Sequence, residues 1–163
     1  KLFSKFNPAL GFNDANAHFP EPGNCDAYDS AIEAAGGLDL QLLGIGFNGH
    51  IAFNEPMRED EIPVEDFGRL PTRVLPLSEE TIVQNTAVTA GGDSSLVPRY
   101  AATMGMAPIL AARKCLLLAC FREQTAPLKA IIEKGCPTPF LPASYLWRHP
   151  DFRLIYTADN IEL

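Results

Sequence analysis

LLGIGFNGHIAFNEP, at residues 42–56, is the stretch on which the fold and the function of this chain depend. It follows an apolar run over residues 38–45 that only Asp39 and Gln41 interrupt. Such a run is typical of a strand that is covered on both faces, which favours a parallel sheet. The glycines at residues 44–49 form the pattern G-x-G-x-x-G at the carboxyl end of this strand, where open parallel sheets bind their ligands.

One interpretation of the glycines is a dinucleotide-binding turn. That turn needs a helix starting within the glycines and an acidic residue at the end of the next strand, about 20 residues on. Here His50 follows the third glycine, and Pro56 stops any helix from running far. Glu65 and Asp66 lie near the required spacing, but within a polar loop. The pattern therefore does not favour a dinucleotide-dependent oxidoreductase.

The other interpretation is a catalytic loop built around His50. The ordinary pKa of histidine lies near neutrality, so its imidazole can accept and return a proton. Asn48 and Glu55 are close enough in sequence to hold the other ring nitrogen, and the glycines Gly46 and Gly49 would let the backbone approach a small ligand and present N–H groups to it. The alternative is a structural histidine bonded to a buried carbonyl. Asparagine, glutamate and glycines gathered at the end of a strand favour the catalytic interpretation.

The rest of the chain alternates strands with helices, so the sequence predicts an α/β fold with an open, mainly parallel sheet and helices on both faces. Residues 1–23 are expected to be irregular with one short helix, and residues 59–69 to form an acidic loop. Further strands are predicted at 72–77, 101–104, 114–121 and 152–157, and helices at 24–35, from Ser78 onward, and at 108–112, 123–134 and 143–149. The 163 residues fit a single domain.

Composition limits the class of partner. The net charge of −7 argues against a nucleic-acid or membrane surface. The longest apolar window, residues 116–121, is too short to span a bilayer, and no secretory leader is visible. No C-x-x-C pair occurs, so buried thiols of a cytoplasmic protein are expected rather than a zinc site or disulfides. Because the chain begins with Lys1 and no start-of-domain pattern, we expect it to be part of a longer protein.

The stretch 42–56 as a whole resembles the signature of the glucosamine-6-phosphate deaminase/isomerase family, which includes a galactosamine-6-phosphate isomerase branch. Later segments resemble further family motifs in the same order: Pro98-Arg99-Tyr100, Thr103-Met104-Gly105, and Pro142-Ala143-Ser144 with Leu146 and His149. The related 6-phosphogluconolactonases share the G-x-x-G-H core but are expected to lack the Asn54-Glu55-Pro56 ending. The resemblance covers roughly residues 24–157 and implies a Rossmann-like fold of the sugar-phosphate isomerase type.

The resemblance implies a reaction and roles for particular residues. Family members open the pyranose ring of an amino-sugar phosphate and move a proton between C2 and C1, and the deaminases release ammonia. His50 matches the ring-opening histidine and Glu55 the carboxylate that orients it. Asn48 stands where relatives have Asp or Asn, and can position the imidazole without sharing its charge. Substrate contacts are expected at Gly46, Phe47, Gly49 and Arg73. Arg122, two positions before Gln124, is a further candidate that would supply a replacement charge, and the alternative is a solvated loop arginine. No metal or organic cofactor is implied, and a homo-oligomer is an open expectation.

Three departures from the family pattern limit these expectations. The enolising aspartate and the Gly/Thr-rich phosphate loop of the family have no counterpart in these residues. The phosphate-binding lysine aligns with Gln124 and a phosphate-binding arginine with Ala87. We therefore expect the C-terminal part of a larger family domain whose N-terminal half is absent. The alternative is a catalytically incomplete sugar-phosphate-binding or regulatory domain. The preferred epimer is left open.

Overall fold

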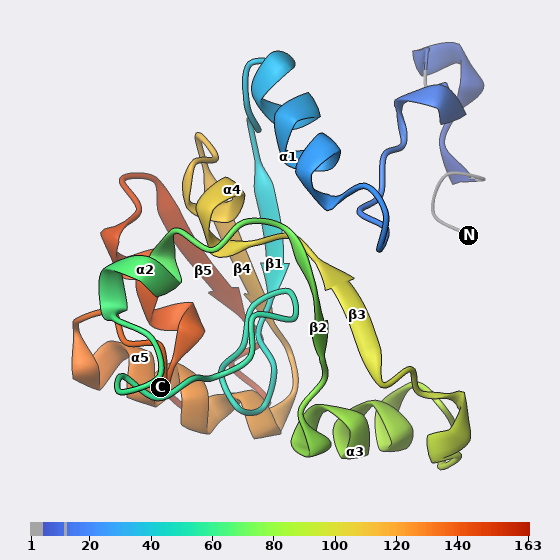
Figure 1. Cartoon of the computed structure of the whole chain (residues 1–163). Coiled ribbons are helices and arrows are strands. Elements are labelled where there is room, and N and C mark those ends of the chain that lie inside the picture. The colour runs from blue at the N-terminus through green and yellow to red at the C-terminus, as the bar shows by residue number, and fades with distance from the viewer. Residues whose placement is uncertain (1–4, 12) are drawn as a thin grey trace.

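The computed structural model describes residues 5–11 and 13–163. Their order along the chain alternates strands with helices, as predicted (Figure 1). The strands are β1 (Gln41–Gly44), β2 (Arg73–Pro76), β3 (Tyr100–Thr103), β4 (Cys115–Ala119) and β5 (Phe152–Tyr156). The helices are α1 (Cys25–Ala34), α2 (Val64–Gly68), α3 (Glu79–Val88), α4 (Met106–Leu110) and α5 (Thr125–Lys134), with short 3₁₀ helices at Pro8–Leu10, Asp14–Asn16, Ser94–Leu96, Arg122–Gln124 and Pro142–Arg148.

Three strands form a parallel sheet in the order β1-β4-β5, with Leu43 opposite Leu117 and Leu117 opposite Leu154. This confirms the predicted α/β class and the mainly parallel sheet. β2 and β3 form a separate antiparallel ribbon, in which Arg73 pairs with Thr103. The ribbon lies beside β1 and leads to α3 at its far end (Figure 1). Because parallel strands end at the same edge, the loops after β1 and β4 lie near each other.

One face of the parallel sheet carries the core. Leu43, Leu117 and Ala119 point to this face and are at most 5% exposed. Helices α2, α4 and α5 and the 3₁₀ helix Pro142–Arg148 cover it and supply further buried side chains, namely Phe67, Met106, Ile109, Leu128, Ile131, Ala143 and Leu146. The hydrophobic effect of this burial is the main stabilising term of the fold.

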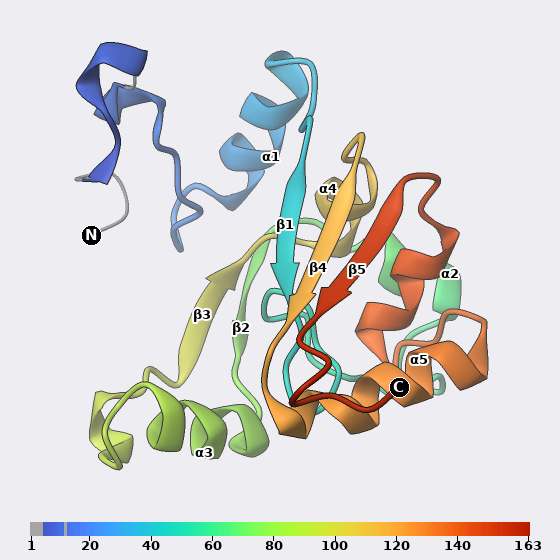
Figure 2. The ribbon, with the colours of Figure 1, turned by 180° about the vertical axis from the view of Figure 1, so that it is seen from behind.

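The opposite face of the sheet is open. Figure 2 shows β1, β4 and β5 from this side with no helix of the described residues lying across them. Leu42, Leu118 and Ile155 are 56%, 40% and 55% exposed, although each alternates along its strand with a core residue. The apolar run that predicted two covered faces is therefore present, but the described helices cover only one of them. We call Leu42, Leu118 and Ile155 the open face.

Local sequence signals, such as capping residues and glycines, correctly predicted where most helices and strands begin and end. Ser78 caps α3 by accepting a hydrogen bond from the Thr81 N–H, as its position before Glu79 and Glu80 predicts. Gly135 ends α5 in the left-handed conformation, with φ of 62°. The prediction of an uninterrupted acidic loop at 59–69 was wrong. Residues after Pro63 form α2, because Phe67 becomes fully buried in the core.

The cysteines, the helices and the metal-ligating side chains can be compared with the expectations from composition. All four cysteines are free, but only Cys115 is buried, while Cys120 and Cys136 are exposed. The expectation of buried thiols therefore holds for one of them. Within the described part of the chain, no helix has the length and the apolar character needed to cross a bilayer. No cluster of three metal-ligating side chains occurs in that same part.

Candidate active site

The glycine loop after β1 folds back on itself and places His50 over Gly46. The Gly46 N–H donates to the His50 carbonyl, and the Gly49 N–H donates to the Gly46 carbonyl. A Cβ atom at Gly46 would lie 2.3 Å from Cε1 of the His50 imidazole, so only glycine lets the ring pack here. Gly49 has φ of 87° and lies against Leu141. The glycines thus serve a close approach within the protein.

His50, Asn48 and Glu55 come together, as predicted. The Nδ1 atom of His50 lies 2.8 Å from the Oδ1 atom of Asn48 and 3.5 Å from the Oε2 atom of Glu55. Asn48 donates from Nδ2 to the same Glu55 oxygen at 2.9 Å. The His50 and Glu55 side chains are only 10% and 12% exposed. Asn48 is therefore the nearer partner of the imidazole, and Glu55 contacts both the imidazole and Asn48.

These bonds fix which nitrogen of His50 carries the proton. An ionised carboxylate can only accept hydrogen bonds, so Asn48 must turn its NH₂ group toward Glu55 and its oxygen toward His50. That oxygen also only accepts, so Nδ1 of His50 must be the protonated nitrogen. Nε2 is then bare, and it makes no hydrogen bond within the described part of the chain. A histidine arranged in this way can take a proton at Nε2.

The environment of Glu55 keeps it ionised. Burial alone would raise the pKa of Glu55, but hydrogen bonds from His50, Thr81 and Asn48, together with the imidazole, outweigh burial and lower the pKa to about 2. The Ser78 N–H at the start of α3 also donates to Oε1 of Glu55 at 3.3 Å. A positive helix end favours an anion in this position.

We expect Glu55→Gln to change how stability depends on acid. A carboxylate with a lowered pKa stabilises the fold fully above its ordinary pKa of 4.5, and this contribution is lost as the pH falls toward 2. Glu55→Gln should therefore lower the free energy of unfolding at pH 7 by roughly 1–3 kcal/mol and flatten its fall between pH 5 and pH 2. Urea unfolding at several pH values measures both effects. Exposed Glu80→Gln is the control, and an equal acid dependence in Glu55→Gln and the wild type would contradict the expectation.

The ends of the loop are held by a second set of contacts. Asn54 is fully buried and donates to the carbonyls of Ile51 and Met104. Its Oδ1 accepts from Nη1 of Arg73 at 2.8 Å. The Phe53 N–H donates to Thr103, in the segment that resembles a later family motif. Arg73 thus supports the loop from β2, and burial lowers the pKa of its guanidinium. Substrate contact by Arg73 stays a prediction.

The N–H groups that Gly46 and Gly49 were predicted to present to a ligand, and that of Phe47 between them, are bonded within the protein. The N–H groups of Gly46 and Gly49 bond within the loop, and the Phe47 N–H donates to the side chain of Gln84 on α3 at 3.2 Å. None of the three is free in this structure. Contact of these residues with a substrate through other atoms stays a prediction.

Gln124 and Arg122 follow β4 and have different surroundings. Gln124 is 5% exposed, and its side chain accepts from the N–H groups of Cys120 and Phe121 and donates to the Ile45 carbonyl. It ties the ends of β4 and β1 together. Arg122 is exposed and lines a separate pocket with Thr125, Asp159, Asn160 and Glu162. No residue of the glycine loop lines that pocket, so Arg122 is not brought together with His50 there.

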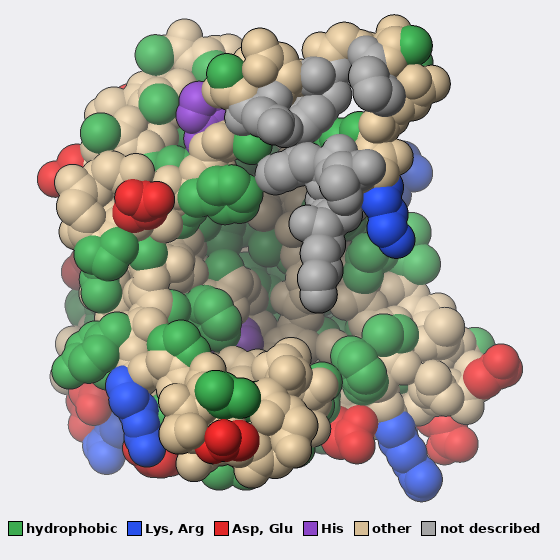
Figure 3. Space-filling model, turned by 90° about the vertical axis from the view of Figure 1, so that its right-hand side faces the viewer, with side chains coloured by type: hydrophobic (Ala, Val, Ile, Leu, Met, Phe, Trp, Pro, Cys, Tyr) green, Lys and Arg blue, Asp and Glu red, His purple; other side chains and the backbone are tan. Residues whose placement is uncertain are grey.

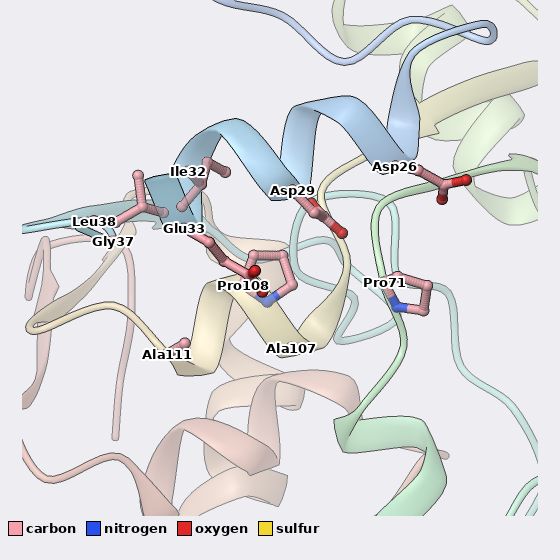
Figure 4. A pocket seen from close by; sticks show the side chains of 10 residues that line it. All are labelled: Asp26, Asp29, Ile32, Glu33, Gly37, Leu38, Pro71, Ala107, Pro108 and Ala111. Carbon is pink, nitrogen blue, oxygen red and sulfur yellow. The ribbon is translucent and has the colours of Figure 1, made fainter. Parts of the chain in front are cut away.

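Another cavity of about 400 Å³ lies beside α1, α4 and Pro71, and Asp26, Asp29 and Glu33 contribute carboxylates to it (Figure 4). Asp29 accepts the Thr72 N–H with one oxygen, while the other oxygen is buried without a partner. Gly37 and Leu38, which also line the cavity, precede β1, whereas His50 follows it. This cavity therefore lies at the amino end of the strand, away from the glycine loop.

Figure 3 shows a side of the molecule with a deep hollow, which has hydrophobic side chains around it and a histidine at its floor.

Sequence reasoning missed the contribution of α3. Ser78, Thr81 and Gln84 contact Glu55, His50 and Phe47 from successive turns of this helix. The capping pattern located the start of the helix, but nothing in it showed that the helix meets the loop. His149 is buried, with Nε2 bonded to the Ala112 carbonyl at 2.7 Å, and is structural.

Comparison with known proteins gives consistent relatives, although no family model matches the chain. It is 38% identical to a glucosamine-6-phosphate deaminase of Thermoanaerobacter pseudethanolicus over 99% of this chain and 62% of the relative. It is 40% identical to one of Shewanella loihica over 93% of this chain and 55% of the relative. The chain thus spans about three-fifths of these relatives, which fits the expectation of a partial family domain.

Solved structures agree. A monomeric glucosamine-6-phosphate deaminase superposes with a TM-score of 0.72 at 32% identity, covering 86% of this chain and 54% of the relative. A 6-phosphogluconolactonase from Plasmodium vivax superposes with a TM-score of 0.64 at 13% identity, covering 91% of this chain and 58% of the relative. The second likeness shows the fold alone. Together they confirm the sugar-phosphate isomerase type of fold.

Proposed function

Because this chain is homologous over nearly its whole length to the glucosamine-6-phosphate deaminase family, we propose that it carries the ring-opening half of an amino-sugar phosphate deaminase. The observation that carries the proposal is the His50–Asn48–Glu55 chain, which leaves Nε2 of His50 bare. The substrate would be glucosamine 6-phosphate or its galacto-epimer, and the products a ketohexose phosphate and ammonia. The homologues at 38–40% identity support the reaction class.

The chemistry expected of His50 is a proton shuttle. Nε2 would accept the proton of the anomeric hydroxyl and return it to the ring oxygen as the bond between C1 and that oxygen breaks, which gives the open-chain aldehyde. The imidazolium formed in between would be stabilised by the Glu55 carboxylate, whose Oε2 lies 3.5 Å from Nδ1. The later transfer of a proton from C2 to C1 needs a base that we do not find in these residues.

We also propose that these residues are one part of a larger domain. The open face would expose apolar side chains to water, which is costly unless another polypeptide segment covers them. The relatives are longer, and the missing enolising base would have to lie on such a segment. Mass spectrometry of the native polypeptide tests this: we expect a mass well above 17.8 kDa. A native mass of 17.8 kDa in a monomer without a bound partner would contradict it.

The function itself is tested by an ammonia-release assay. The native polypeptide that contains this sequence should release ammonia from glucosamine 6-phosphate or galactosamine 6-phosphate, with kcat in the usual enzymatic range of roughly 1–10³ s⁻¹. Ketohexose phosphate should form in equal amounts. No ammonia from either epimer, in folded protein, would contradict the proposal. A homo-oligomer and a cytoplasmic location stay predictions, and the solved relative is described as monomeric.

A second candidate is a sugar-phosphate-binding or regulatory domain. It is favoured by Gln124, which stands where the family has a phosphate-binding lysine and uses its side-chain oxygen and nitrogen within the protein. The carbonyl of Gln124 cannot supply the charged donor that a phosphate prefers. Calorimetric titration with the two sugar phosphates, run beside the ammonia assay, separates the candidates: binding without turnover supports the second.

A further inference from the structure

Thr81, on the first turn of α3, lies next to the imidazole of His50. It is 2% exposed, its Oγ1 atom lies 3.4 Å from Nδ1 of His50, and its side chain helps to lower the pKa of Glu55. It is not part of the glycine loop, and no pattern in the sequence connected it with His50. A buried hydroxyl has a single proton, so it can donate to the carboxylate or to the imidazole but not to both.

The contacts of Thr81 indicate which group accepts the proton of its hydroxyl. The Thr81 N–H donates to the Ser78 Oγ atom, and the Ser78 hydroxyl donates to Thr81 Oγ1 at 3.1 Å. Thr81 therefore accepts from Ser78, and its own proton is left for Glu55 or His50. Glu55 is the charged acceptor, and a hydrogen bond from Thr81 is among the causes of its lowered pKa. Thr81 then presents no donor to Nδ1 of His50, and its Oγ1 atom, 3.4 Å away, can accept from Nδ1–H beside Oδ1 of Asn48.

We infer that Thr81 is a positioning residue: its Oγ1 atom accepts from the Ser78 hydroxyl and faces Nδ1 of His50 as a second acceptor beside Asn48, which helps to hold His50 in the Nδ1–H tautomer, with Nε2 bare. Ser78 contributes twice, through the backbone N–H that donates to Glu55 and through the hydroxyl that donates to Thr81. The consequence for ring opening rests on the proposed function. The tautomer of His50 does not, because it is a property of the protein without substrate.

The test is nitrogen-15 NMR of the histidine side chains in the protein without substrate. In the wild type, we expect the chemical shifts of His50 to show the Nδ1–H form almost alone. Thr81→Val keeps the shape of the side chain and removes the hydroxyl, and should raise the share of the Nε2–H form on the order of tenfold. Thr81→Ser restores the hydroxyl and should restore the wild-type shifts.

Thr86→Val is the matched control. Thr86 lies on the same helix, and its hydroxyl donates to the Ile82 carbonyl at 2.7 Å, away from His50. It should leave the His50 shifts unchanged. A folded Thr81→Val variant with wild-type shifts would overturn the inference. If that variant does not fold, the wild type still decides: a His50 whose Nε2 carries the proton overturns it.

A kinetic measurement adds the functional consequence. Thr81→Val should lower kcat for ammonia release on the order of tenfold with little change in KM, and Thr81→Ser should restore it. A changed tautomer in a protein that releases no ammonia would support the inference and contradict the proposed function. Full activity of Thr81→Val with an unchanged tautomer would contradict the inference and support the proposed function.

Discussion

His50→Gln should reduce ammonia release from the amino-sugar phosphate by roughly 10²–10⁴-fold in kcat/KM, the usual contribution of a general acid–base residue. The amide nitrogen of glutamine can still donate a hydrogen bond to Oδ1 of Asn48, but glutamine cannot take up a proton at the position of Nε2. The loop should stay folded, because the bonds of Asn54 to Ile51 and Met104 do not involve His50. The measurement is initial-rate kinetics with circular dichroism to confirm folding.

The matched control for this variant is His18→Gln. His18 is exposed and belongs to the segment before α1, so its replacement removes a histidine without touching the loop. We expect wild-type kinetics from it. If His50→Gln retained more than about half of the wild-type rate, His50 could not be the proton shuttle, since an imidazole in that role contributes far more.

Gly46→Ala should cause a loss of activity of similar size with a smaller loss of stability. The added Cβ would lie 2.3 Å from Cε1 and 2.5 Å from Nδ1 of His50, so the imidazole must leave its position. Moving the ring breaks its bond to Asn48 and removes the proton acceptor from the site, and misplacement of about 1 Å can already cost 10²-fold. The clash involves a side chain, which can rotate away, so the fold should survive.

Gly44→Ala is the control for this second prediction. Gly44 lies two residues earlier in the same sequence, and a Cβ there meets no atom within 4 Å. The two variants thus differ only in whether the new methyl group reaches His50. Kinetics and thermal unfolding of both, side by side, measure the effect. Equal activity of Gly46→Ala and Gly44→Ala would show that the packing of the imidazole on Gly46 does not matter for turnover.

The outcome for individual residues shows which inferences a sequence supports. The helix start at Ser78, the helix end at Gly135 and the strand before Gly44 were predictable, because caps, left-handed glycines and apolar runs act over a few residues. The grouping of His50, Asn48 and Glu55 was also predictable, since all three lie on one short loop. The helix after Pro63 was missed, because it depends on Phe67 reaching a core formed by distant segments.

Only the tertiary structure showed which side chains of the site bond to one another. The sequence suggested that Asn48 and Glu55 both hold His50, and the structure adds that Nδ1 lies nearer to Asn48, at 2.8 Å, than to Glu55, at 3.5 Å, while Asn48 also donates to Glu55. Similarly, the alignment of Gln124 with a family lysine said only that a charge was missing. The structure adds that its carbonyl bonds two backbone N–H groups after β4 and its amide reaches the loop after β1.

The sequence by itself determined the class of fold, the grouping of His50, Asn48 and Glu55 on one loop and the likeness to glucosamine-6-phosphate deaminases, because each depends on residues close together in the chain or on a long specific motif. Only the tertiary structure decided that Ser78 and Thr81 surround Glu55 and that one face of the sheet is left open. Contacts between α3 and the loop join residues more than twenty positions apart. They follow from the packing of the ribbon β2–β3 beside β1, for which no local pattern exists.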